Sequence, residues 1–121
     1  MSTSKQCKGV DRCMILVRAI VRPEKKDVLL AELSEAGFHA ATVIDVVGRG
    51  KQMGIRVGDV VYDEIPKSLI FMAVPAEAKE KIVAIILKHA KSGDKGSFGD
   101  GKIFISAIDE VYTVSSGATG L

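Results

Sequence analysis

Two glycine-rich segments hold the residues of this 121-residue chain that could do chemistry. One is GRGK at Gly48 to Lys51, and the other is GDGK at Gly99 to Lys102. Glycine lets main-chain N–H groups approach an anion closely, and a neighbouring lysine neutralises phosphate charge. The two segments therefore predict phosphate binding, with a pair of ordinary turns that carry solvated lysines as the alternative. Neither is a Walker motif, because Ile103 stands where that motif needs Ser or Thr for magnesium.

The hydrophobic pattern predicts the elements that hold these segments. Four apolar runs rich in β-branched residues predict strands, and two stretches with apolar residues at helical spacing predict helices. The strands are expected over 14–21, 40–47, 67–74 and 102–108, and the helices over 24–36 and 78–90. Pro66 and Pro75 are expected to bound the third strand. Residues 55–65 fit either a β-ribbon or a mobile loop, and 111–114 fit a short ribbon.

This order of elements, βαββαβ, predicts an α+β fold of the ferredoxin-like class, in which two helices cover one face of an antiparallel sheet. We expect one domain over 13–121, preceded by a flexible extension over 1–12. The strands MILVRAIV and SLIFMAV carry apolar residues on both faces, whereas the helices cover only one. A second copy of the chain is the natural cover for the other face, so we expect a homo-oligomer.

Composition limits the classes of partner. The formal net charge is only +2, and the apolar runs are far shorter than a membrane span. We therefore expect no nucleic-acid partner and no membrane insertion. The first residues are polar where a secretory signal needs an apolar core, which predicts a cytoplasmic protein. Cys7 and Cys13 are expected to be free thiols there, with a disulfide or a shared metal as the alternative.

In its motifs, the chain resembles the PII signal-transduction proteins, the GlnB and GlnK family. The resemblance covers nearly all of residues 14–117 and rests on ATVIDVVGRGKQMG, on EIPKSLIFMAV and on GDGKIF. That family is ferredoxin-like and trimeric, binds ATP or ADP in clefts between subunits and, with magnesium and ATP, binds 2-oxoglutarate. The resemblance therefore implies a PII-like homotrimer that senses adenine nucleotides and 2-oxoglutarate.

The same resemblance assigns roles to individual residues. It implies adenine-nucleotide binding by Thr42, Gly48, Arg49, Gly50, Lys51, Gly99, Asp100, Gly101 and Lys102. Gln52 matches the glutamine that helps to ligate the magnesium to which 2-oxoglutarate also binds, and Lys67 matches the lysine that pairs with the distal carboxylate of 2-oxoglutarate. Thr113 and Ser115 stand where the family commonly has arginines that reach the phosphates, so the preference among ATP, ADP and AMP stays open.

Residues 54–65 match the T-loop, the mobile arm through which family members bind their targets. Arg56, Asp59, Tyr62 and Asp63 are its candidate contact residues. The family's segment with a modifiable tyrosine is missing, so uridylylation is not expected, and GDVVYDEIPK is similar to the branch found with nitrogenase genes. The resemblance thus implies control of a target protein, with nitrogenase first. The alternative is a divergent PII-like nucleotide sensor that regulates a transporter or another metabolic enzyme without 2-oxoglutarate.

Other functions of βαββαβ domains fit the residues less well. The chain has no asparagine, which a ferredoxin-like acylphosphatase needs, and no Ser-His-Asp or Cys-His set is evident. RNA-recognition domains stack bases on strand aromatics, whereas the third predicted strand offers only Phe71. We therefore expect a protein that is neither an enzyme nor an RNA-binding module.

Overall fold

The computed structural model of the chain describes residues 13–49, 55–57, 60–62 and 64–120. Within these residues, no helix has both the length and the apolar content that crossing a membrane requires. The predicted N-terminal extension over 1–12 lies outside the described residues.

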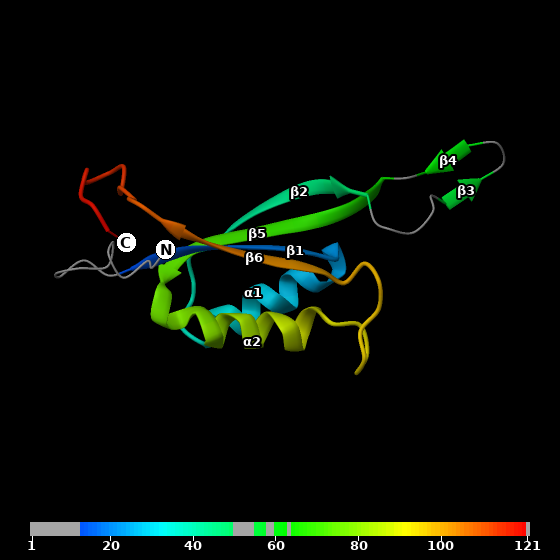
Figure 1. Cartoon of the computed structure of the whole chain (residues 1–121), viewed down its shortest axis with the longest axis horizontal. Coiled ribbons are helices and arrows are strands. Elements are labelled where there is room, and N and C mark those ends of the chain that lie inside the picture. Colours follow the sequence, from blue (N-terminus) through cyan, green and yellow to red (C-terminus); the bar gives the residue numbers. More distant parts are fainter. Residues whose placement is uncertain (1–12, 50–54, 58–59, 63, 121) are drawn as a thin grey trace.

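Four strands form one antiparallel sheet below which two helices pack (Figure 1). The strands are β1 (Met14–Val21), β2 (Thr42–Gly48), β5 (Ile65–Pro75) and β6 (Gly101–Ile108), in the order β2-β5-β1-β6. The helices are α1 (Lys26–Glu35) and α2 (Lys79–Ala90), each preceded by one 3-10 turn, Pro23–Lys25 and Ala76–Ala78. This is the predicted ferredoxin-like α+β fold, and the predicted bounds of β1 are confirmed.

The core lies between the sheet and the two helices. Every second residue of β1 from Ile15 to Val21 is buried, because alternate side chains of a strand point to the same face. In the helices, the buried positions are Leu29 and Leu33 of α1 and Ile82, Ile86 and Ala90 of α2, at the spacing of one helical face. Helix α1 ends at Glu35, and the predicted glycine follows two residues later, where Gly37 has a φ of 99°.

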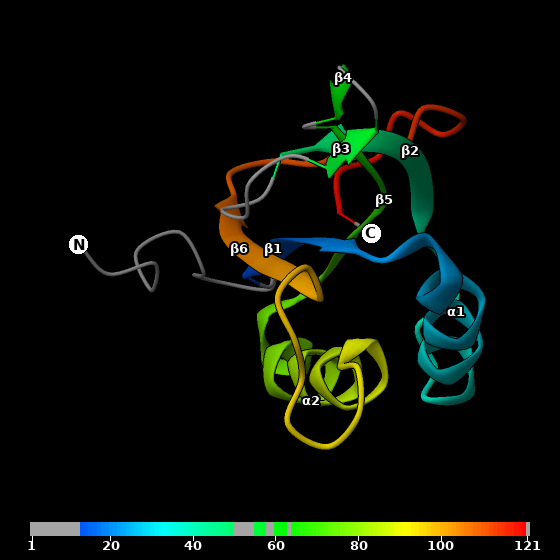
Figure 2. The same cartoon turned by 90° about the vertical axis from the view of Figure 1, so that its right-hand side faces the viewer.

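Among the described residues, no helix lies on the second face of the sheet (Figure 2). Its residues follow from the register, in which Leu69 of β5 lies opposite both Ile44 of β2 and Ile20 of β1. Arg18 of β1 pairs with Phe71 on one side and with Phe104 on the other. Ile44 is 45% exposed and Phe104 is 47% exposed, which is unusual for large apolar side chains in a sheet. The observation supports the prediction that this face is covered by self-association.

Residues 55–62 include a short ribbon beyond the end of the main sheet (Figure 1). Strand β3 (Ile55–Val57) pairs with β4 (Val60–Tyr62) in a separate two-stranded sheet. Of the two alternatives for this segment, the structure selects the ribbon. Strand β5 begins at Ile65, three residues after β4 ends at Tyr62, so a displacement of the ribbon would act on the start of β5.

Two sequence-based expectations are wrong. Pro66 lies inside β5 rather than before it, because β5 at this point pairs only with β2, through Val47, and its pairing with β1 begins at Ser68. A proline is tolerated there since a strand with one neighbour needs fewer N–H donors.

Cys13 is disulfide-bonded rather than a free thiol. The second cysteine of the sequence lies outside the described residues.

Candidate functional site

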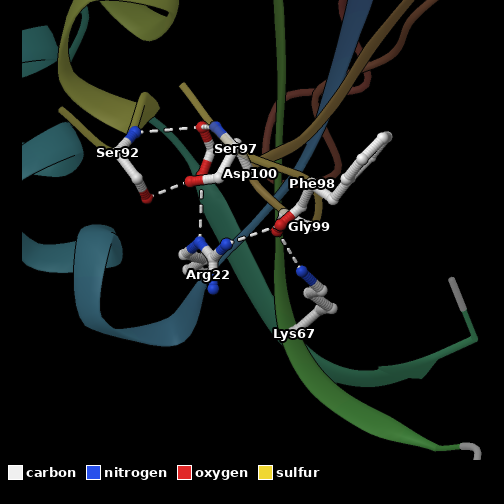
Figure 3. A network of polar contacts seen from close by, with 7 residues as sticks. All are labelled: Arg22, Lys67, Ser92, Ser97, Phe98, Gly99 and Asp100. Atoms are coloured by element: carbon white, nitrogen blue, oxygen red, sulfur yellow. Dashed lines mark hydrogen bonds and ion pairs between the residues drawn. The ribbon is translucent and has the colours of Figure 1, made fainter. Parts of the chain in front are cut away.

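The segment between α2 and β6 is held in shape by one carboxylate. Asp100 accepts four hydrogen bonds (Figure 3). Its Oδ1 accepts from Arg22 Nε at 3.0 Å and from Ser92 Oγ at 2.6 Å, and its Oδ2 accepts from the main-chain nitrogens of Ser92 at 2.9 Å and Ser97 at 2.8 Å. The bonds from Ser92 are the main cause that holds the pKa of the Asp100 carboxyl well below its usual range. We call residues 92–100 the glycine loop.

Two cations tie the glycine loop to the sheet. Arg22, directly after β1, donates through Nη2 to the Phe98 carbonyl oxygen at 2.7 Å and forms an ion pair with Asp100. Lys67 of β5 donates through Nζ to the Gly99 carbonyl oxygen (Figure 3). Burial is the first cause, and the nearby Arg22 guanidinium the second, that lowers the pKa of Lys67 below its ordinary value. The loop is thus anchored to the ends of two adjacent strands.

The glycines of the second segment are required by the geometry. Gly99 and Gly101 have φ values of 91° and 120°, a region that favours glycine. A Cβ atom on Gly101 would lie 1.8 Å from the Ile20 carbonyl oxygen, so the backbones approach too closely for any side chain. The GDGK segment therefore begins β6 in a conformation that alanine does not fit.

The first glycine-rich segment meets the second across Lys67. A Cβ atom on Gly48, the last residue of β2, would lie 3.5 Å from Lys67 Cγ, while Lys67 Nζ lies against Gly99. The structure thereby brings Gly48, Lys67 and Gly99 together at one end of the sheet. Asp100, Gly101 and Lys102 continue from Gly99 into β6, and Arg49 is exposed directly after β2.

Thr42 does not join this group within one chain. It is the first residue of β2, six residues before Gly48, so an extended strand places it about 20 Å away. Arg56 lies opposite Val61, and Tyr62 opposite Ile55, in the β3–β4 ribbon. The other candidates lie outside the described residues, namely Gly50, Lys51, Gln52, Asp59 and Asp63.

Three residues of the site were not predicted from the sequence. Arg22, Ser92 and Ser97 supply all four donors to Asp100, but their positions follow no periodic pattern. The signal available was chemical: an arginine at the end of a strand and two serines flanking a glycine-rich turn are typical donors for a carboxylate.

The arrangement suits the recognition of anions. Arg22 and Lys67 lie beside the only described acid of the network, Asp100, whose oxygens are already engaged by four donors. In the part of the chain that the structure describes, no three His, Cys, Asp or Glu residues could hold a metal ion together. The fold and the site therefore define a ferredoxin-like protein with a cation-rich end, from which a ribbon projects.

Comparisons with known proteins identify the family to which the chain is similar. The family described as Nitrogen regulatory protein P-II matches residues 14–118. A relative from Methanosarcina barkeri, described as Nitrogen fixation nifHD2 region GlnB-like protein 1, is 51% identical over 108 residues, which are 89% of this chain and all of the relative. The Nitrogen regulatory protein P-II 2 of Methanothermobacter thermautotrophicus is 43% identical over 106 residues, 84% of this chain and 90% of its own length.

A solved structure shows the same fold. The crystal structure of Arabidopsis thaliana PII bound to citrate superposes with a TM-score of 0.72 and 27% identity, covering 91% of this chain and 88% of that one. The chain belongs to the P-II nitrogen regulatory protein family. Proteins of this family are regulatory signal transducers that bind small-molecule effectors and control target proteins as trimers. The prediction that the protein is not an enzyme is confirmed.

Proposed function

We propose that this protein senses adenine nucleotides and 2-oxoglutarate and controls nitrogenase through the arm at residues 54–65. The observation that carries the proposal is the position of Lys67. It contacts the glycine loop through Gly99, and it lies only two residues after Ile65, where the chain returns from the β3–β4 ribbon. A ligand that engages Lys67 competes with the Gly99 carbonyl and so acts on the loop and on the foot of the ribbon together.

The nucleotide phosphates would lie between the two glycine-rich segments. Lys102 and the N–H groups of residues 99–102 would face them from one side, and Gly48 to Lys51 from the other. The donor chemistry fits a polyanion, because Arg22 adds positive charge at the same end of the sheet. A magnesium ion with ATP would supply charge neutralisation there, with Gln52 as its protein ligand in the absence of a described carboxylate cluster.

The 2-oxoglutarate carboxylate would pair with Lys67. The Arabidopsis relative is bound to citrate, which is also a small carboxylate. Because Lys67 is partly desolvated beside Arg22, a carboxylate would relieve the repulsion between these two cations and gain charge-assisted hydrogen bonds.

A homotrimer would complete the site. Thr42 lies about 20 Å from Gly48 in the same strand, so it reaches a nucleotide at the glycine loop only from a neighbouring copy. The exposed apolar face that includes Ile44 and Phe104 provides the surface for such an assembly. Adenine nucleotides and 2-oxoglutarate are intracellular metabolites, so the protein would act in the cytoplasm.

The target follows from the relatives and the arm. Relatives at 45% and 51% identity are described as proteins of nitrogen fixation nifHD regions, which favours a nitrogenase component as the partner. Arg56, Asp59, Tyr62 and Asp63 would supply the contacts. Replacing residues 56–63 by a glycine-serine linker should abolish inhibition of nitrogenase in an activity assay and leave ligand affinity unchanged.

Calorimetric titration tests the ligands. The protein is titrated with ATP, ADP and AMP, each with magnesium and with or without 2-oxoglutarate. We expect 2-oxoglutarate to bind only in the presence of ATP, and Lys102→Ala to weaken ATP binding about tenfold while the oligomer stays intact. Lys88→Ala is the matched control, because Lys88 is an exposed lysine in the last turn of α2. This variant should bind ATP as the wild type does.

The same titration separates the alternative function. If 2-oxoglutarate does not bind under any condition while nucleotides do, the protein is a nucleotide sensor for a transporter or another metabolic enzyme. If no adenine nucleotide binds, the sensor proposal is wrong in both forms.

A further inference from the structure

A hollow lies on the helix side of the sheet. A pocket of about 880 Å³ opens between the second half of α2, the glycine loop and the start of β6. Figure 2 shows the loop, in yellow, running from the end of α2 to the start of β6. This volume is within the range of pockets that bind small organic molecules.

The floor of the pocket is aliphatic. It is formed by α2 and by the two strands above it, with Val83, Ile86, Leu87, Ala90, Val21 and Ile103 as lining residues. Ile86 and Val21 are almost fully buried, whereas Leu87 is 53% exposed, so the floor extends from the core to the surface. Phe98 of the glycine loop adds an apolar wall and is 74% exposed. Together they leave apolar surface in contact with water, which an apolar ligand body would cover.

The rim of the pocket is positively charged. Lys91, Lys95 and Lys102 line it, and within the described residues none of them forms an ion pair. Asp100 is the only acid among the described residues of the lining, and its oxygens are engaged by Arg22, Ser92 and Ser97. The rim therefore carries a positive charge that no described acid neutralises.

The loop is folded so that charge and apolar floor lie close together. A Cβ atom on Gly96 would lie 3.1 Å from Lys91 Cγ, which shows that the loop packs back on the residue that follows α2. The stem of Lys91 thus lies against the loop, with the ammonium group free to reach the mouth of the pocket.

We propose that this pocket binds an amphipathic anion, with an aliphatic chain on the floor and a carboxylate or phosphate head group at Lys91 and Lys95. A nucleotide is a poorer occupant. Within the part of the chain that the structure describes, the floor offers no polar side chain to the edge of a base, because the polar lining residues all belong to the loop region from Lys91 to Lys102.

This site differs from the cation-rich end of the sheet that contains Lys67 and Gly48. Neither of these two residues lines the pocket. The two sites share the glycine loop as a wall, with Asp100, Gly101 and Lys102 as the common residues. The inference therefore does not depend on the proposed nucleotide sensing, although an occupant of the pocket would contact the same loop.

Calorimetric titration of the full-length protein tests the proposal, with sodium decanoate and decyl phosphate as anionic probes below their micelle concentrations. Decyltrimethylammonium, which has the same chain and the opposite charge, is the control ligand. We expect both anions to bind at one site per chain and the cation to bind at least tenfold more weakly. Comparable binding of all three probes would overturn the proposal, because the rim would then contribute nothing.

Variants locate the site. Lys91→Glu combined with Lys95→Glu should weaken decanoate binding about tenfold, and Leu87→Ser should weaken it several-fold. Lys88→Glu is the matched control, because this exposed lysine of α2 does not line the pocket. Equal affinity of the double variant and the control would refute the assignment, as would complete loss of decanoate binding in saturating ATP, which would make the pocket part of the nucleotide site. Nucleotide titrations of the same variants report separately on the proposed function.

Discussion

Asp100→Asn tests how the glycine loop is held. The substitution keeps the size of the side chain and removes its charge. If the amide oxygen keeps the two main-chain donors of Ser92 and Ser97, the NH₂ group occupies the place of Oδ1. The NH₂ group then faces Arg22 Nε, which in the wild-type protein donates to Oδ1 at 3.0 Å. Two donors meet, and the ion pair between Arg22 and Asp100 is lost.

The expected loss of unfolding free energy is moderate. A hydrogen bond to a charged group contributes about 1.5–3 kcal/mol. The side chains of Arg22 and Asp100 are 29% and 18% exposed, so solvent screens part of this interaction. We expect the variant to be less stable by about 1.5 kcal/mol at pH 7, from the lower end of that range.

The pH dependence has a definite sign. The folded state lowers the pKa of Asp100, so its carboxylate stabilises the protein above the ordinary pKa of an aspartate, about 3.9. That contribution is lost as the pH falls through the lowered value. The difference in stability between wild type and variant should therefore be full at pH 7 and decrease below about pH 4.

Urea unfolding followed by circular dichroism, at one protein concentration, measures this difference between pH 7 and pH 3. Asp94→Asn is the matched control, because Asp94 lies in the same loop and is exposed. The explanation fails if the control loses as much stability as the Asp100 variant. It also fails if the difference at pH 7 persists unchanged to pH 3.

Two further substitutions test other parts of the site. In thermal unfolding, Gly101→Ala should destabilise the fold by about 3 kcal/mol or disrupt the start of β6, because its Cβ would lie 1.8 Å from the Ile20 oxygen. Gly93→Ala, at a φ of 67° with open space around it, is the control and should cost about 1 kcal/mol in the same experiment. Lys67→Met keeps the apolar stem and removes the ammonium. We expect it to weaken 2-oxoglutarate binding about tenfold in calorimetry and to leave ATP binding alone nearly unchanged; equal losses for both ligands would show that Lys67 serves the nucleotide instead.

Local patterns were sufficient for most of the fold. The strand MILVRAIV, the helix over 79–90 and the strand that begins within GDGK were predicted within one or two residues, because the order of the residues determines which alternate or helically spaced side chains are buried. The position of Pro66 was predicted wrongly, because it depends on how many strands pair with β5 at that residue. Pairing of β5 with β1 begins only at Ser68, and no local sequence pattern records that.

From the sequence by itself, anion binding is a prediction that rests on the glycines and lysines of GRGK and GDGK. Only the tertiary structure decided which groups meet. Arg22 and Asp100 are 78 positions apart and Lys67 and Gly99 are 32 apart, yet each pair is in direct contact. Thr42, although close to Gly48 in sequence, is held away from it because an extended strand keeps residues apart along its length. Spacing along the chain reports the distance between residues within one element, whereas contacts between elements depend on how the sheet orders its strands.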